Sequence, residues 1–169
     1  DALPIFADLV EGKKVLDTGM TQEIDRCRAA LEEAAAGENV VVISSGDAGI
    51  YGMAGLVLEL LMKMDEDQRP EFGGVIPGVS AMSAAAGLLG APIMHDFAVI
   101  SLSDLLTPWE LIQERAELAA KGDFVTVLYN PRSHKRVGQI QAVQEIFLRE
   151  RASETPVGIV TSASREGEN

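Results

Sequence analysis

The sequence predicts an α/β protein with a largely parallel sheet, and two observations support this prediction. Apolar runs rich in β-branched residues alternate with helical patterns along the 169 residues, an order typical of strands joined by crossover helices. Turns rich in small residues follow several of these runs, as they do at the carboxyl ends of strands in open sheets. The predicted strands are 40–44, 74–76, 97–102, 124–129 and 157–161.

The helices predicted between these strands span 22–36, 53–64, 81–89, 109–121 and 136–151. The first contains Cys27, the single cysteine, which we interpret as a small core residue. The third is rich in alanine, and Ser80 before it is a good N-cap. That helix ends at Gly90, and Pro92 then resets the backbone, so we place a boundary between two small domains, 1–95 and 96–169.

The strand over 40–44 has four consecutive β-branched residues, which favour a strand covered on both faces. The turn after it has a glycine at every third position from Gly46 to Gly55, but it matches neither common phosphate-binding glycine motif. At its tip, Asp47 would repel a pyrophosphate, whereas a ligand with hydroxyls, an amino group or a cationic sulfur would suit it. The alternative is that Asp47 only caps the following helix.

A further polar turn follows the strand over 124–129. Asn130 precedes Pro131 and is therefore expected to be extended, with its side-chain amide available for hydrogen bonds. Basic residues then gather within five positions, against the charge of the rest of the chain; they are Arg132, His134, Lys135 and Arg136. As surface cations in the first turn of a helix, they would be slightly disfavoured by the helix dipole.

Composition excludes several classes of function. The net charge of −12 argues against a nucleic-acid partner, because phosphate contacts need a basic face. The apolar runs are shorter than the roughly 20 residues that span a bilayer, and no signal segment opens the chain. A single cysteine excludes a disulfide framework and a cysteine-based metal cluster. We therefore expect a cytoplasmic protein with no membrane partner.

Several motifs resemble those of the tetrapyrrole methylases of the cobalamin pathway, most closely the branch that methylates carbon 17 of precorrin-3B. The motifs are SSGDAGIYGMAG at 44–55, IPGVSA at 76–81, DFAVISLSDLLTPW at 96–109 and LYNPRS at 128–133, together with 18–24 and 155–160. They occur in order through nearly the whole chain. The family's opening strand and glycine–proline–glycine loop precede this pattern and are missing here, as are its final strands, so we expect an internal fragment.

The resemblance implies S-adenosylmethionine as cofactor, bound in a cleft between two α/β domains. This agrees with Asp47, since the cofactor has an ammonium, a sulfonium and no phosphate. The implied cofactor-binding residues are Ser45, Gly46, Asp47, Ile50, Ser80 and Ala81 in the first domain, and Tyr129, Asn130, Thr161, Ser162 and Ala163 in the second. Tyr51 could pack on the cofactor, although a core aromatic is the plainer interpretation.

The reaction that the resemblance implies is methyl transfer from a cationic sulfur to a ring carbon, coupled to contraction of the macrocycle. Positioning in a dry cleft is the main requirement, and no metal is needed. His134 and Asp104 are candidates for the proton transfer that contraction requires, although a loop histidine is often simply solvated. Arg132, Lys135 and Arg136 could clamp the acetate and propionate groups of the substrate. A homodimer is also expected.

Three alternatives remain at this point. Relatives with the same fold methylate a modified histidine of a translation factor or a ribose of ribosomal RNA; the acidic charge disfavours the RNA substrate. A dinucleotide-dependent oxidoreductase would need the phosphate cradle that Asp47 opposes. A fragment without catalytic activity is the third.

Overall fold

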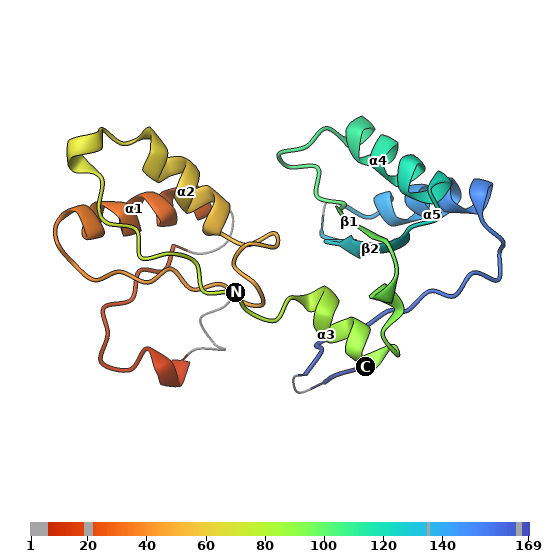
Figure 1. Ribbon diagram of the computed structural model, residues 1–169, viewed down its shortest axis with the longest axis horizontal. Coiled ribbons are helices and arrows are strands. Elements are labelled where there is room, and N and C mark those ends of the chain that lie inside the picture. Colours follow the sequence, from red (N-terminus) through yellow and green to blue (C-terminus); the bar gives the residue numbers. More distant parts are fainter. Residues whose placement is uncertain (1–6, 19–21, 135, 165–166) are drawn as a thin grey trace. The chain divides into compact units, whose positions relative to one another are not determined.

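The computed structural model describes residues 7–18, 22–134, 136–164 and 167–169. The chain forms two compact units, Asp1–Ala81 and Met82–Asn169, which are described separately below (Figure 1). Lys135 and part of the motif at 18–24 lie outside the described residues. The domain boundary after residue 95 stays a prediction.

The first unit is built on two packed helices, α1 (Glu23–Ala35) and α2 (Ala54–Lys63). Short 3-10 helices precede and follow them at Ala7–Leu9 and Glu66–Gln68. Cys27 and Leu31 of α1 pack with Val57 and Leu61 of α2 in a small hydrophobic core. Cys27 is fully buried, which confirms it as a core residue, and burial raises the pKa of its thiol.

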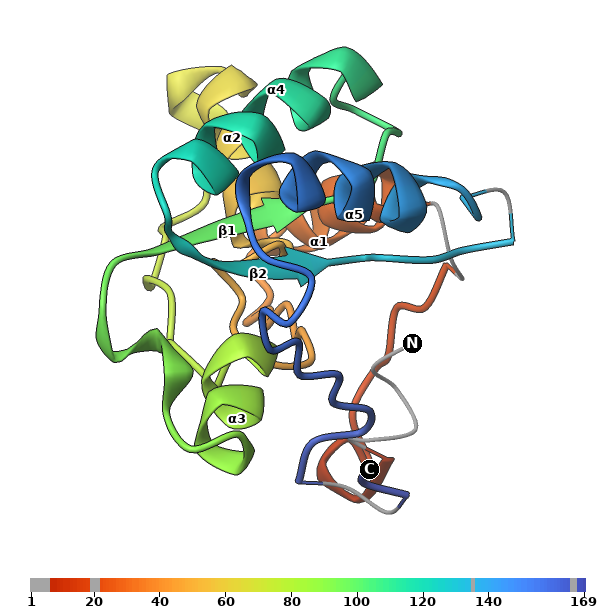
Figure 2. The ribbon, with the colours of Figure 1, turned by 90° about the vertical axis from the view of Figure 1, so that its right-hand side faces the viewer.

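The second unit contains a two-stranded parallel sheet of β1 (Phe97–Ser101) and β2 (Val125–Tyr129), in which Ser101 lies opposite Tyr129. It also contains α3 (Ala81–Leu88), which begins at the last residue of the first unit, and a 3-10 helix at Pro92–Met94. Helices α4 (Trp109–Lys121) and α5 (Gln139–Glu150) cover one face of the sheet, and α3 lies on its other side (Figure 2). The carboxyl ends of both strands therefore meet at one edge.

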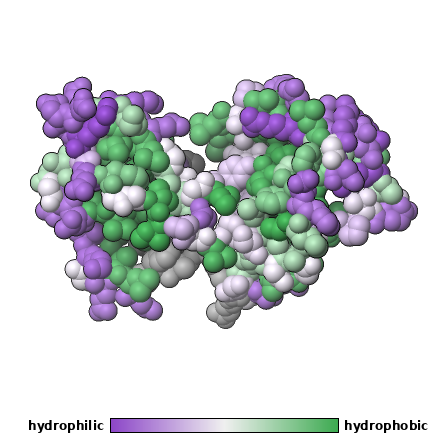
Figure 3. Space-filling model, in the orientation of Figure 1, coloured by the Kyte–Doolittle hydropathy of each residue, from purple (hydrophilic) through white to green (hydrophobic). Residues whose placement is uncertain are grey.

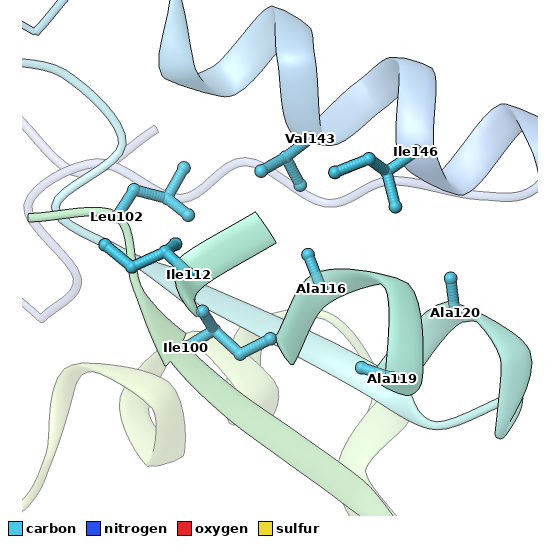
Figure 4. Packing of buried hydrophobic residues seen from close by; sticks show 8 residues of the cluster. All are labelled: Ile100, Leu102, Ile112, Ala116, Ala119, Ala120, Val143 and Ile146. Atoms are coloured by element: carbon cyan, nitrogen blue, oxygen red, sulfur yellow. The ribbon is translucent and has the colours of Figure 1, made fainter. Parts of the chain in front are cut away.

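Buried aliphatic side chains from β1, α4 and α5 form the core of the second unit (Figure 4). Val143 and Ile146 of α5 face Ile112 and the small side chains of α4, because Ala116, Ala119 and Ala120 let the two helices approach closely. This core holds the ends of β1 and β2, and the polar turns that follow them, on a packed support.

All five predicted helices form, with ends that differ by at most three residues, and so do the predicted strands over 97–102 and 124–129. The mixed α/β class with a parallel sheet is therefore confirmed. No helix in the described part of the chain is both long and apolar enough to cross a membrane.

The strands predicted at 40–44, 74–76 and 157–161 are wrong, because in the described chain these segments are irregular and belong to no sheet. Each segment has a largely exposed apolar side chain: Val41 is 82% exposed, Ile76 89% and Ile159 83%. Hydrophobic side chains are accordingly open to the surface on both units (Figure 3). A strand needs a neighbour to complete its hydrogen bonds, and β-branched composition alone does not supply one.

Candidate functional site

Asp47 joins two loops of the first unit. One carboxylate oxygen, Oδ1, accepts a hydrogen bond from the backbone N–H of Gly49 at 2.7 Å, and Oδ2 accepts one from Gly78 at 3.0 Å. Residues 47 and 78 are 31 positions apart, so the carboxylate ties the glycine-rich turn to the loop at 77–80. We call this arrangement the Asp47 clasp. The helix-cap alternative is wrong, since α2 begins at Ala54 and its N-cap, Met53, has no side-chain cap hydrogen bond.

The two loops of the clasp touch backbone to backbone. A Cβ atom added to Gly78 would lie 2.2 Å from the carbonyl oxygen of Gly46, so only glycine fits there. Gly46 itself has φ +77°, in the left-handed region that favours glycine. Ser80, at the end of the second loop, is 4% exposed and directly precedes α3. Sequence reasoning missed Gly78, although its place in the small-residue run after Pro77 was a signal.

The other cofactor-binding candidates of the first unit lie along the same two loops. Ser45 and Ala81 are exposed, and the N–H of Ile50 donates to the carbonyl of Asp47 at 3.3 Å. Tyr51 is 54% exposed with φ +52°, so its interpretation as a core aromatic is wrong. An exposed aromatic in a strained backbone conformation beside the clasp is compatible with a ligand-facing role.

The pKa of the Asp47 carboxyl lies below its ordinary value of 3.8, first because of the hydrogen bond from Gly78 and then because of that from Gly49. A folded-state pKa below the unfolded value means that the clasp is fully formed above pH 3.8 and is lost as the pH falls through the lower, folded value. We expect the amide resonances of Gly49 and Gly78 to titrate together with a midpoint below pH 3.8. Asp47→Asn should remove this titration, and a midpoint at or above 3.8 in the unaltered protein would contradict the clasp.

In the second unit, Tyr129 is the last residue of β2, opposite the last residue of β1, and Asn130 follows it. The hydroxyl oxygen of Tyr129 accepts a hydrogen bond from the N–H of Met82, in the first turn of α3, at 2.9 Å. Asn130 has φ +52°, so the extended conformation expected before a proline is wrong. Its Nδ2 donates to the Oγ of Ser101 at 3.0 Å, and this compensates for the left-handed backbone. Ser101 was missed by sequence reasoning.

The remaining cofactor candidates, Thr161, Ser162 and Ala163, lie in the last part of the second unit. The N–H of Thr161 donates to the carbonyl of Asn169 at 2.7 Å, and the N–H of Asn169 donates back at 3.1 Å. Ser162 has φ +53°. The cofactor candidates thus divide between the two units.

The basic segment after β2 contains two different kinds of arginine. Arg132 and His134 are exposed and line an open depression of about 450 Å³ together with Ser133 and Val137. Arg136 is 8% exposed and lies 3.5 Å, measured from Nη1, from Oδ1 of Asp104. The structure therefore forms two pairs, each of a proton-transfer candidate and an anion-binding candidate. His134 shares the depression with Arg132, and Asp104 lies beside Arg136. Neither arginine lies in a first helical turn, because α5 begins at Gln139.

These features define a protein with glycine-rich and polar turns suited to a small ligand, and comparison with known proteins identifies its family. The profile of the tetrapyrrole (corrin/porphyrin) methylases matches residues 2–169, so the chain belongs to this family, as its motifs predicted.

Within the family, the chain is similar to methyltransferases named for cobalt-factor III or precorrin-3B, some of them for carbon 17. It is 54% identical over 156 residues to the probable cobalt-factor III C(17)-methyltransferase of Salmonella typhimurium, covering 92% of this chain and 64% of that protein. It is 51% identical to the cobalt-factor III methyltransferase of Priestia megaterium, covering 96% and 31%. A precorrin-3B C(17)-methyltransferase of Sinorhizobium is 42% identical, covering 87% and 58%.

Among solved structures, the chain is similar to the methyltransferase CobJ, with a TM-score of 0.84 and 39% sequence identity over 94% of this chain and 66% of that one. This likeness extends through both units of the chain. The chain spans between 31% and 64% of the length of the three curated relatives named above.

Proposed function

We propose that the protein transfers a methyl group from S-adenosylmethionine to carbon 17 of a corrin precursor, precorrin-3B, with contraction of the macrocycle, in cobalamin biosynthesis. The observation that carries this proposal is the identity of 54% and 42%, over most of the chain, to two proteins named for that position. Relatives that act on a protein or on RNA are not favoured by these names or by the net charge of −12.

The residues of the first unit fit this cofactor. Two backbone N–H groups hold the Asp47 carboxylate and keep its pKa low, so it is ionised at neutral pH. A fixed negative charge suits a cationic ligand and opposes the pyrophosphate of a dinucleotide. Bound S-adenosylmethionine would supply an activated methyl group on a cationic sulfur. The implied binding residues would hold and orient it, and the methyl group and the ring carbon would then need only correct alignment and exclusion of water.

The residues proposed for the tetrapyrrole lie in the second unit. Arg132, at the depression that it shares with His134, would pair with a substrate carboxylate, and Lys135 is a further candidate outside the described residues. His134 is the proposed proton donor or acceptor for ring contraction. A homodimer and a cytoplasmic location remain predictions.

Calorimetric titration with S-adenosylhomocysteine, made with the protein at its natural full length, tests the cofactor assignment. We expect saturable binding that an equal concentration of NAD does not displace. A protein that is folded by circular dichroism but does not bind S-adenosylhomocysteine would overturn the proposal, and displacement by NAD would favour the oxidoreductase alternative.

Arg132→Ala is expected to weaken binding of precorrin-3B by about fivefold, because an exposed charge pair contributes up to about 1 kcal/mol. Binding of S-adenosylhomocysteine should not change. A matched control is Arg28→Ala, which removes another exposed arginine, whose partner is Asp25 in the first unit. Equal affinities for precorrin-3B in the Arg132 variant and the unaltered protein would remove Arg132 from the substrate site.

A further inference from the structure

Arg136 is surrounded by groups of its own chain. Its side chain is only 10% exposed; its Nε donates to the backbone carbonyl of Asn130 at 3.0 Å, and its Nη1 lies 3.5 Å from Asp104. Its backbone is fixed as well, since Ser133 and Arg136 exchange hydrogen bonds in both directions at 3.0 Å. A guanidinium engaged on two sides and largely buried has little surface left for a substrate carboxylate.

The contact with Asn130 holds a residue of unusual backbone conformation in place. Asn130 has φ +52°, in the left-handed region that residues other than glycine seldom adopt, although Asn does so more often than most. Its carbonyl is held by Arg136 and its side-chain amide by Ser101, the last residue of β1. Ser101 Oγ also accepts the N–H of Ser103 at 3.2 Å. Arg136 therefore determines the direction of Asn130 from one side, and the end of β1 does so from the other.

Asp104 has both oxygens occupied in the same network. Oδ1 faces Arg136, and Oδ2 accepts a hydrogen bond from Nε2 of Gln139, the first residue of α5, at 3.1 Å. The carboxylate thus connects the loop after β1 to the start of α5 and neutralises the charge of the buried arginine. The carboxylate is 36% exposed, but both of its oxygens are engaged by side chains of this chain, as in a structural ion pair.

We propose that Arg136 and Asp104 are positioning residues that hold Asn130 in its cofactor-binding conformation, and that neither contacts the tetrapyrrole. This inference rests on the proposed function, because it takes Asn130 to be a cofactor residue. Under this inference Arg132, which is exposed, is the described arginine of the basic segment that binds substrate carboxylates. It also leaves His134 as the candidate for proton transfer.

Arg136→Lys, in the full-length protein, separates positioning from substrate binding. Lysine keeps a positive charge near Asp104 but loses the planar fork that reaches the Asn130 carbonyl. We expect affinity for S-adenosylhomocysteine to fall by about tenfold, the effect of one hydrogen bond with a charged partner, while affinity for precorrin-3B stays within about twofold. Arg132→Ala should show the opposite pattern.

The other outcomes overturn the inference. A variant that binds S-adenosylhomocysteine normally shows that Arg136 does not act through Asn130, and loss of precorrin-3B affinity shows that it contacts the tetrapyrrole. If the unaltered protein fails to bind S-adenosylhomocysteine, the proposed function itself fails, which is a distinguishable result.

Asp104→Asn gives a second measurement and replaces the first if the lysine variant does not fold. A positioning role predicts that KM for S-adenosylmethionine rises more than kcat falls, and that the pH profile of kcat keeps its shape. A general acid or base at this position would instead cost about 100-fold or more in kcat and would remove one limb of the profile. That result would overturn the assignment of Asp104.

Discussion

Gly78→Ala is expected to abolish measurable binding of S-adenosylhomocysteine. The added Cβ would lie 2.2 Å from the carbonyl oxygen of Gly46, a backbone atom that cannot turn away as a flexible side chain could. The loop at 77–80 must therefore move back from the glycine-rich turn, and the hydrogen bond from Gly78 to Asp47 is lost with it. Isothermal titration calorimetry of the full-length protein gives the affinity, and circular dichroism shows that the helices remain.

Gly55→Ala is the matched control for this substitution. Gly55 lies in α2, and an added Cβ at this position meets nothing within 4 Å. Alanine there should raise the free energy of unfolding by about 0.5–1 kcal/mol, because it is a better helix former than glycine, and should not affect ligand affinity. Normal binding by the Gly78 variant would show that the close approach of the two loops is not needed for the site.

Ile112→Ala is expected to lower the free energy of unfolding by about 2–5 kcal/mol, the range observed when a large aliphatic side chain is removed from a core. Ile112 is 1% exposed and lies in the cluster that joins β1, α4 and α5 (Figure 4). The cavity left behind would not close easily, since its neighbours belong to three different elements. Urea unfolding monitored by circular dichroism measures the change.

Leu118→Ala in the same helix serves as the comparison. Leu118 is 61% exposed, so its removal should change the free energy of unfolding by no more than about 0.5 kcal/mol. The two substitutions have the same alanine product in one helix and differ mainly in burial. Equal effects would show that the cluster around Ile112 does not carry the stability of the second unit.

The helices could be predicted because their signals are local. The pattern over 109–121 gave both ends of α4, and the largest difference was at the start of α5, where Arg136 belongs to the loop and not to the helix. Strands depend on partners that are distant in sequence. The β-branched run at 40–44 has all the composition of a strand, yet it has no strand partner in the described chain, whereas 97–101 pairs with 125–129.

The family could be predicted from the motifs, whereas the connections within the site could not. The family prediction was confirmed, and the preference of the Asp47 turn for a ligand without phosphate stays a prediction. The sequence did not reveal that Asp47 binds the loop at 77–80, because that contact joins residues 31 positions apart. Burial was equally hidden: Arg132 and Arg136 look alike in sequence, and only packing makes one exposed and the other buried.

The Asp47 clasp also means that positions 47 and 78 cannot vary independently. The carboxylate is useful only while the Gly78 amide is near it, and the absence of a side chain at 78 matters only while the two loops touch. Substitutions at the two positions should therefore be less than additive, as is usual for residues in direct contact. In a chain that has lost the carboxylate at position 47, the hydrogen bond to the amide of residue 78 is already absent. Replacing Gly78 in such a chain should therefore have a smaller effect than in the unaltered protein.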